Sequence, residues 1–181
     1  MEEKIRLQRI RMLSAWGDFK LALSAADFFQ EADEDEKYTL VELRRFKCYE
    51  RTAVVSYARP FSQSKGETPK LSLKMCGVQL TPSEQAFHTR VINLRNKLIA
   101  HSDLEMMNFV SQTRAMPDVA EGFHSVLTRH DEGLQFYHWR DQSDLVNLIR
   151  KVSFALFDTI HNITKTDPGA FNLSIISKKI D

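Results

Sequence analysis

The stretch from Ser143 to Thr164, SDLVNLIRKVSFALFDTIHNIT, carries the most regular hydrophobic pattern of the chain. Apolar residues recur in it at spacings of three and four, which places them on one face of an α-helix. The residues of this face are Leu145, Leu148, Val152, Leu156, Ile160 and Ile163. We therefore expect a long amphipathic helix that buries this face against other helices and ends before Pro168-Gly169.

Two segments upstream show the same period. A helix is expected over about residues 3–32 and a second one over about 39–58, where Pro60 stops it. The apolar face of the first comprises Met12, Trp16, Phe19, Leu23 and Ala26. The face of the second comprises Leu40, Leu43, Phe46, Ala53 and Tyr57, with Val41, Cys48 and Val55 beside it. Glu50 falls on this otherwise apolar face, and the pattern gives no reason for it.

A third helix upstream begins with a clear signal. Thr81 is placed as N-cap, Pro82 as the first helical residue, and Glu84 completes a capping box. The apolar stripe that follows is Phe87, Val91, Leu94 and Leu98, and the helix should end near Ser102. Residues 60–80, which precede this helix, lack apolar periodicity and read as a loop.

Between the third and last helices we expect a small β-hairpin, with strands at Phe123–Thr128 and Leu134–Trp139 around the turn Asp131-Glu132-Gly133. The fold class is therefore mainly α, a bundle of four long helices with a hairpin between the third and the last. Residues 1–167 form this domain, with the hairpin insertion at about 104–140, and 168–181 form a C-terminal tail.

Composition narrows the class of protein. With 181 residues, 43% of them hydrophobic, the chain can bury a core without disulfides or metal. Cys48 and Cys76 lack CxxC spacing, so reduced thiols are expected. No signal peptide and no apolar run of about 18 residues is present, so we expect a cytoplasmic protein without membrane contact. The net charge of +1 argues against a strongly polyanion-binding protein on total charge alone.

The segment Leu94 to His101, LRNKLIAH, is where the sequence points to a chemistry. His101 lies seven residues after Leu94 and so continues the buried stripe, while Arg95 can approach it by its length or from a second copy. Histidine exchanges a proton near neutral pH, and arginine stays charged and offers a planar fork to phosphate oxygens. The alternative is that His101 merely stabilises the helix C-terminus and that Arg95 is an ordinary surface residue.

This segment resembles the signature of the HEPN superfamily, an arginine, a polar residue, then a histidine after four to six intervening positions, which here are Asn96 to Ala100. With Ser102 and Asp103 it is most similar to the abortive-infection U-type branch, as is the stretch Tyr57 to Phe61, YARPF. The resemblance implies a homodimeric helical bundle with the motif helices facing each other, and a ribonuclease that needs no metal or other cofactor. It also implies a toxin or antiviral setting, with a cognate antitoxin or regulator as partner.

Roles for individual residues follow from the resemblance. His101 would act on the ribose 2′-hydroxyl or on the leaving 5′-oxygen, Arg95 would bind the scissile phosphate, and Asn96 would orient His101 or contact the phosphate. The product would carry a 2′,3′-cyclic phosphate. The alternative function is a dimer of the same fold that binds nucleic acid or protein without catalysis.

Positive charge gathers on the second and third helices and the loop between them, and it offers a surface for RNA. The basic residues are Arg44, Arg45, Lys47, Arg51, Arg59, Lys65, Lys70, Lys74, Arg90, Arg95 and Lys97. Lys97, Arg90 and Arg59 are the candidate RNA-binding cations, and Tyr57 is a candidate for stacking on a base. The alternatives are a solvated basic face balanced by the acidic turn at 31–36, and core packing of Tyr57.

Metal binding has weak support in the sequence. Zinc-site spacings and the HExxH pattern are missing, and His124, His130 and His138 flank the expected hairpin. We expect no metal site.

Overall fold

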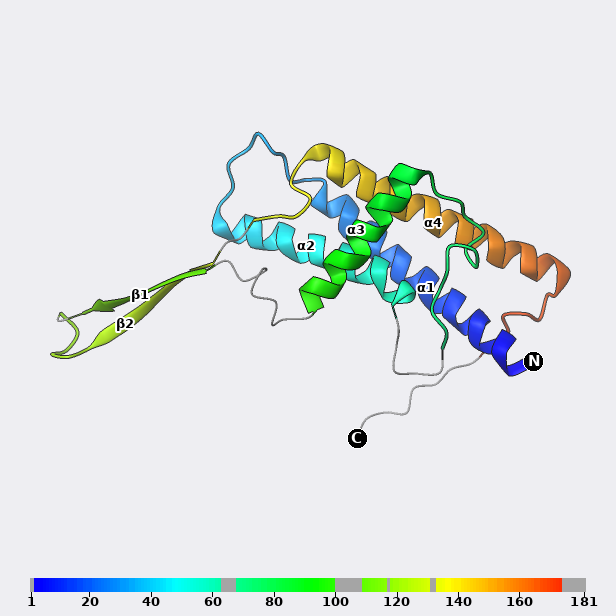
Figure 1. The fold of residues 1–181 in the computed structure, drawn as a ribbon, viewed down its shortest axis with the longest axis horizontal. Coiled ribbons are helices and arrows are strands. Elements are labelled where there is room, and N and C mark those ends of the chain that lie inside the picture. Colours follow the sequence, from blue (N-terminus) through cyan, green and yellow to red (C-terminus); the bar gives the residue numbers. More distant parts are fainter. Residues whose placement is uncertain (1, 63–67, 100–108, 117, 131–132, 174–181) are drawn as a thin grey trace.

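A computed structural model describes residues 2–62, 68–99, 109–116, 118–130 and 133–173 of the chain. Four long helices dominate it, as the sequence predicts, and a two-stranded antiparallel hairpin lies between the third and the fourth (Figure 1). The elements are α1 (Glu2–Phe29), α2 (Leu40–Ala58), the short 3₁₀ helix η1 (Arg59–Phe61), α3 (Pro82–Ile99), β1 (Phe109–Ala115), β2 (His124–His130) and α4 (Trp139–Thr166).

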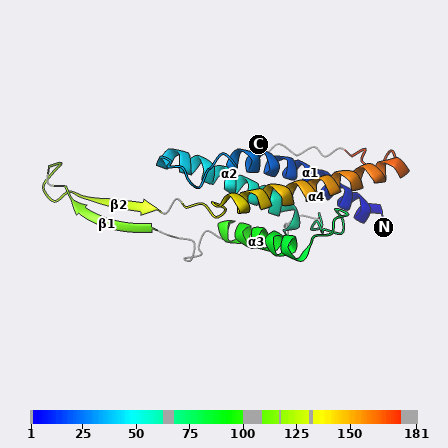
Figure 2. The same ribbon diagram turned by 90° about the horizontal axis from the view of Figure 1, so that it is seen from above.

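The helices pack around one hydrophobic core. α1 contacts both α2 and α4, and α3 contacts α2 and, less extensively, α4. Seen from above, α3 lies on one side of α4 and α1 on the other (Figure 2). The largest fully buried side chains come from α1, α2, α3, α4 and the segment before α4, and include Phe19, Phe29, Phe46, Tyr57, Val91, Phe136, Leu145, Ile149 and Leu156. Among the described residues, no helix has the length and apolar character needed to cross a membrane.

Reciprocal side-chain caps set the starts of α2 and α3. At α3, the backbone N–H of Thr81 donates to Glu84 at 2.7 Å, and that of Glu84 donates to the Thr81 hydroxyl at 3.3 Å. The predicted capping box is therefore confirmed. Thr39 and Glu42 form the same arrangement at the start of α2, so both helices begin at a residue that satisfies otherwise unpaired N–H groups.

The predicted apolar faces are buried along most of their length. Leu145, Leu148, Val152 and Leu156 of α4 are buried, and Met12, Phe19 and Ala26 of α1 are buried as well. Burial along α2 begins only at Phe46. Leu40, which the periodicity places on the buried face, lies in the first turn of α2 and is 59% exposed, so that assignment is wrong; Val41 and Cys48 are also exposed.

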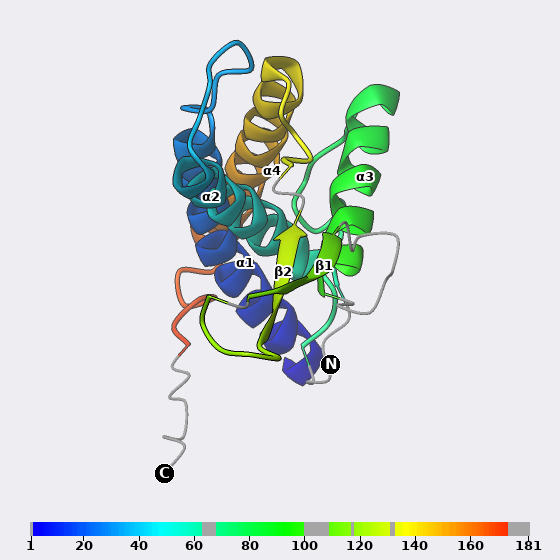
Figure 3. The ribbon, with the colours of Figure 1, turned by 90° about the vertical axis from the view of Figure 1, so that its left-hand side faces the viewer.

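The hairpin uses a different pair of strands from the pair that the sequence suggests. β1 pairs with β2 from Phe109 opposite His130 to Ala115 opposite His124, and it projects from the end of the bundle (Figures 1 and 3). Gly122, at φ +76°, lies in the turn, which is closed by a bond from Met116 N–H to the Phe123 carbonyl. The hairpin therefore closes between Met116 and Phe123, whereas Asp131 and Glu132 of the expected turn lie outside the described residues.

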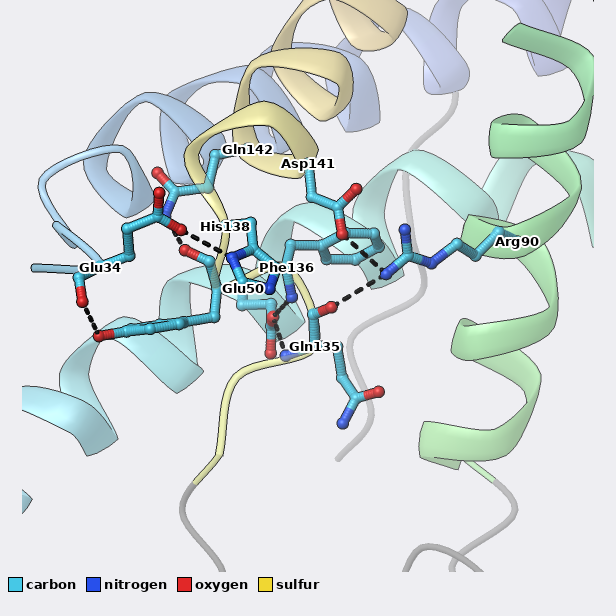
Figure 4. Close-up of polar contacts among 9 residues, drawn as sticks. Glu34, Glu50, Arg90, Gln135, Phe136, His138, Asp141 and Gln142 are labelled. Atoms are coloured by element: carbon cyan, nitrogen blue, oxygen red, sulfur yellow. Dashed lines mark hydrogen bonds and ion pairs between the residues drawn. The ribbon is translucent and has the colours of Figure 1, made fainter. Parts of the chain in front are cut away.

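The segment that was expected to form the second strand lies in the loop before α4, which starts at Trp139 instead of Ser143. Its backbone N–H groups bind a buried carboxylate instead of a neighbouring strand, because Glu50 accepts from Gln135 and Phe136 (Figure 4). Phe136 is fully buried, so the alternation of apolar residues here reflects a loop inserted into the core.

The loop between η1 and α3 is anchored over its described part, residues 68–80. Leu71 and Cys76 are buried, and the Arg11 guanidinium donates to the Pro69 carbonyl at 2.7 Å and to the Thr68 hydroxyl at 2.8 Å. Gly77, at φ +69°, lies so close to α4 that a Cβ there would approach Thr159 Oγ1 to 2.6 Å. The loop therefore fastens α1 and α4 together.

Candidate functional site

Helix α3 carries most of the residues to which the sequence assigns a chemistry, and its position is fixed by contacts along its first half. Lys151 of α4 donates to both Glu84 carboxylate oxygens, at 2.8 and 2.7 Å. This ion pair and the capping bonds to Thr81 hold the pKa of Glu84 below its ordinary value. Val91 and Leu94 then bury the inner face, so the register of the following residues is set.

Arg95 lies near the end of α3 and is half-buried. Its Nη1 donates to Asn96 Oδ1 at 3.2 Å. Its Nε is buried, and none of the described residues offers it an acceptor. A buried donor without an acceptor is uncommon in folded proteins, because desolvation of such a group costs about 1–3 kcal/mol. Asn96 and Lys97, which follow it, are exposed.

The third residue of the proposed catalytic set, His101, lies outside the described residues, as do Ser102 and Asp103. The convergence of Arg95 and His101 therefore stays a prediction. Pairing of two α3 helices across a dimer likewise stays a prediction.

Arg90 lies on α3 and is engaged with the segment that leads into α4. Its guanidinium donates to Asp141 at 2.9 Å and to the Gln135 carbonyl at 3.1 Å (Figure 4). The same group stacks over the Phe136 ring, 4.8 Å from its centroid. Arg90 is about half exposed, so a phosphate could reach it only in competition with Asp141.

Arg59, in η1, is also paired with a carboxylate. It donates to Asp18 of α1 at 2.9 Å, and the Asp18 side chain is largely buried. Burial raises the pKa of Asp18, and the nearby positive charges of Arg59 and Arg11 act in the opposite direction. This ion pair links η1 to α1, so the contact made by Arg59 in the folded chain is structural.

Tyr57 does not present its ring for base stacking. It is completely buried, and its hydroxyl lies 2.7 Å from Nδ1 of His88. Phe61 packs edge-on against His88 with centroids 4.8 Å apart. Burial raises the pKa of Tyr57 well above its ordinary value and lowers that of His88. The structure shows the alternative, core packing of Tyr57. Tyr57 therefore does not belong to the RNA-binding residues.

The cations of α2 and α3 can form one basic surface only if the two helices pack together. The two helices contact each other directly. Several of its cations are nevertheless neutralised: Arg45 lies 3.9 Å from Glu31, and Arg59 and Arg90 pair with Asp18 and Asp141. Lys65 lies outside the described residues. The basic surface is therefore weaker than the sequence count suggests.

Glu50 is the polar residue that sequence reasoning left without a role. It is only 2% exposed, and its Oε1 accepts the backbone N–H groups of Gln135 and Phe136 at 2.6 and 2.7 Å. Burial raises the pKa of Glu50, while these two bonds oppose that shift. A lone carboxylate on an apolar helix face was the signal, since such a group needs buried donors.

Further contacts complete a polar clamp around this loop (Figure 4). The Tyr137 hydroxyl donates to the Glu34 carbonyl at 2.8 Å, and His138 Nδ1 lies 2.7 Å from the Glu34 carboxylate. Gln142 donates to the Ala32 carbonyl at 2.9 Å. The clamp, defined by Glu34, Glu50, Arg90 and Gln142, ties the loop between α1 and α2 to α2, α3 and α4.

A groove between α3 and α4 was also missed by the sequence. It has a volume of about 530 Å³. Apolar, charged, hydroxyl and amide side chains line it: Ser83, Glu84, Ala86, Phe87, Arg90, Asp144, Asn147 and Leu148. No periodicity argument could have located it, because it arises from the limited contact between the two helices.

Of the three histidines around the expected hairpin, His138 contacts Glu34 and His124 contacts the Gly122 carbonyl. Within the described part of the chain, no group of three metal-binding side chains comes together.

No family model, no curated protein and no solved structure matches this chain. The assignment of a function therefore depends on the residues themselves.

Proposed function

We propose that this protein is a HEPN-like, metal-independent RNA endonuclease that acts as a homodimer. The single observation that carries the proposal is the segment Leu94 to His101, which begins on α3 of a mainly helical bundle. Its arginine keeps a buried Nε for which no described residue provides an acceptor. The Nε itself is enclosed, but Arg95 as a whole is only half-buried, and the guanidinium is a group that fits phosphate oxygens well.

In the proposed reaction, His101 accepts the proton of the ribose 2′-hydroxyl, whose oxygen attacks the adjacent phosphorus. The bond from phosphorus to the 5′-oxygen breaks, and the leaving oxygen receives a proton, from His101 or from its second copy in the dimer. The products are a 2′,3′-cyclic phosphate and a 5′-hydroxyl. Arg95 stabilises the charge that builds on the phosphate, and Asn96 holds the guanidinium through the Nη1 contact.

The surroundings of Arg95 favour an anionic ligand. Lys97 is exposed two residues further along α3, and α2, which contacts α3, adds Arg44, Lys47 and Arg51. We include Lys97 in the RNA-binding surface, and Arg90 and Arg59 only where a phosphate displaces their carboxylate partners. A toxin or antiviral role, an antitoxin or regulator as partner, and a cytoplasmic location are proposed from the resemblance alone.

The deciding experiment is an RNA cleavage assay in EDTA, with product ends analysed for 2′,3′-cyclic phosphate. We expect His101→Ala to lose cleavage by about 10²–10⁴-fold and Arg95→Ala by about 10²–10³-fold, which are typical effects of removing a general base and a transition-state donor. Circular dichroism establishes that the variants fold. The matched controls are His161→Ala and Arg140→Ala, which change exposed residues of α4.

Two outcomes would contradict catalysis. Wild-type protein that binds RNA in a salt-dependent way without cutting it would favour the binding dimer, especially if His101→Ala left affinity unchanged and Lys97→Ala lowered it. Wild-type protein that neither binds nor cuts RNA would favour a protein-interaction bundle.

A further inference from the structure

The groove between α3 and α4 is bridged by two ion pairs that join its walls. In one of them Lys151 of α4 binds both carboxylate oxygens of Glu84 on α3, at 2.8 and 2.7 Å. In the other, Arg90 of α3 binds Asp141 of α4 at 2.9 Å. The groove is therefore formed in the folded chain without a ligand, and its volume of about 530 Å³ lies within the range of small-molecule sites.

Two polar side chains of α4 in this groove have no partner within the described part of the chain. Asp144 and Asn147 are exposed, and neither makes a hydrogen bond or ion pair to another described residue. They lie three residues apart, so they are neighbours on one side of the helix. Asp144 offers a carboxylate that accepts, and Asn147 offers an amide that both donates and accepts. This wall of the groove therefore presents hydrogen-bonding groups that the fold does not use.

Arg90 supplies donors on the opposite wall. Its bonds to Asp141 and to the Gln135 carbonyl are both made by Nη2, which leaves Nη1 without a described acceptor (Figure 4). The guanidinium is held over the Phe136 ring, 4.8 Å from its centroid. Asp144 lies three residues beyond Asp141 on α4, and side chains at this spacing are about 5–6 Å apart. The donors of Arg90 and the carboxylate of Asp144 are therefore separated by about the width of a flat ring.

Apolar surface accompanies these polar groups. Phe87 of α3 and Leu148 of α4 line the groove, and the ring of Phe87 is only partly buried. An accessible aromatic side chain is a common contact for the face of a nucleobase.

The signs of the polar groups select the class of ligand. A purely cationic ligand would face Arg90, and a purely anionic one would face Asp144. A neutral flat ring with acceptors on one edge and donors on another meets both residues, and the ion pairs that bridge the groove can stay intact.

Guanine is a ring of this kind. Its O6 and N7 accept hydrogen bonds from arginine, and its N1–H and N2 amino group are adjacent donors that fit the two oxygens of a carboxylate. Adenine and cytosine carry an acceptor nitrogen beside their amino group, which a carboxylate repels. Uracil has a single ring N–H between two carbonyl groups. Of the four RNA bases, guanine therefore matches the pair of Arg90 and Asp144 best.

We propose that the groove between α3 and α4 binds a guanine base. The base lies against Phe87, its N1–H and N2 amino group donate to Asp144, and its O6 accepts from Arg90. The proposed function makes RNA the source of this base, and only that attribution rests on it. A free guanosine nucleotide presents the same edges.

The test is an NMR titration of the full chain with the 5′-monophosphates of guanosine, inosine and adenosine, which share the ribose and phosphate and differ in the base. We expect guanosine monophosphate to bind saturably. Inosine monophosphate lacks the N2 amino group and should bind about tenfold more weakly, since a hydrogen bond to a charged group is lost. Adenosine monophosphate, with an acceptor in place of N1–H, should bind at least about tenfold more weakly.

Asp144→Asn tests the assigned carboxylate and keeps the size of the side chain. We expect it to lower the affinity for guanosine monophosphate at least about tenfold and to remove the preference over inosine monophosphate. Asp158→Asn, at another exposed acid of α4, is the matched control and should leave both affinities unchanged. The NMR spectrum of each variant without nucleotide establishes that it folds.

Three results would overturn the inference: no saturable binding of guanosine monophosphate, equal affinity for the three nucleotides, or binding that Asp144→Asn leaves unchanged. A single-stranded 2′-O-methyl oligoadenylate that carries one guanosine distinguishes the two sources of the base. Tighter binding of this oligonucleotide than of the monophosphate assigns the groove to RNA, whereas binding of the monophosphate alone assigns it to free nucleotides.

The proposed function fails or stands separately. RNA cleavage in EDTA by a chain that does not bind guanosine monophosphate would overturn the guanine site and leave the nuclease standing. Guanine-specific binding by a chain that does not cleave RNA would do the reverse.

Discussion

Two charged residues, Glu50 on α2 and Arg95 on α3, differ in how their buried polar atoms are satisfied. The Glu50 carboxylate accepts two backbone N–H groups at 2.6 and 2.7 Å and is almost completely buried. Arg95 is only half-buried, yet its Nε has no acceptor among the described residues. A satisfied buried polar group holds the fold together, whereas an unsatisfied one lowers stability.

The largest effect is expected from Glu50→Ala. The substitution leaves the N–H groups of Gln135 and Phe136 without an acceptor in the core, and we expect the free energy of unfolding to fall by about 2–5 kcal/mol. Chemical denaturation measures the loss. Glu36→Ala, at an exposed position of the acidic turn, is the control. Equal stability of the two variants would break the comparison, since Glu50 would then not support the loop before α4.

A smaller loss of stability, about 1–2 kcal/mol, is expected from Glu50→Gln, because the amide keeps one acceptor oxygen.

Glu50→Gln also tests how the stability of the fold depends on pH. Burial raises the pKa of Glu50 in the folded state above its ordinary value of 4.5, so the folded chain binds the proton more tightly than the unfolded chain. Wild-type stability should therefore decline as pH rises from about 4.5 through the folded pKa. Glu50→Gln should flatten that part of the profile, and an unchanged slope would assign it to other groups.

Arg90→Met should lower stability by only about 0.5–1 kcal/mol. The residue loses the ion pair to Asp141 and the bond to the Gln135 carbonyl, but the guanidinium is about half exposed and water replaces these contacts. Thermal unfolding of Arg90→Met and Glu50→Ala shows which of the two residues of the polar clamp contributes more to stability. A loss as large as that of Glu50→Ala would show that Arg90, too, holds the loop before α4.

The smallest effect on stability is expected from Arg95→Met. Methionine keeps most of the apolar stem and removes a buried donor that has no described acceptor, so the free energy of unfolding should stay within about 0.5 kcal/mol of wild type or rise. Denaturant titration compares the stability of Arg95→Met with that of wild type, and the EDTA-resistant cleavage assay compares their activity. A clear loss of stability would indicate that Arg95 is structural, and that would count against its proposed role.

Local sequence patterns were sufficient for the helices but not for the contacts between them. The spacing of Leu145, Leu148 and Val152 and the cap at Thr81 depend on residues a few positions apart, and both predictions are confirmed. The strand proposed at 134–139 is wrong, because Glu50, some 85 positions away in sequence, takes the N–H groups that a strand would use.

The same distinction, between local patterns and contacts that join separate elements, applies to the candidate site. The motif makes Arg95 a candidate site residue, and its placement on α3 agrees with the helix prediction. It could not show that Tyr57 is enclosed by Phe61 and His88, since that depends on how α2, η1 and α3 meet. The ion pairs that neutralise Arg59 and Arg90 likewise join separate elements and leave no local pattern.

Gly77 packs closely against Thr159 of α4. The reactivity of the neighbouring Cys76 thiol can therefore report when this loop moves away from α4. The adjacent Cys76 is sealed in the core, and burial raises the pKa of its thiol to about 12, so almost none of it is thiolate at neutral pH. Cys48, by contrast, is exposed. Alkylating reagents should therefore modify Cys48 at once and Cys76 only during moments when the loop lifts away from α4, and the slow phase of labelling records how often that occurs.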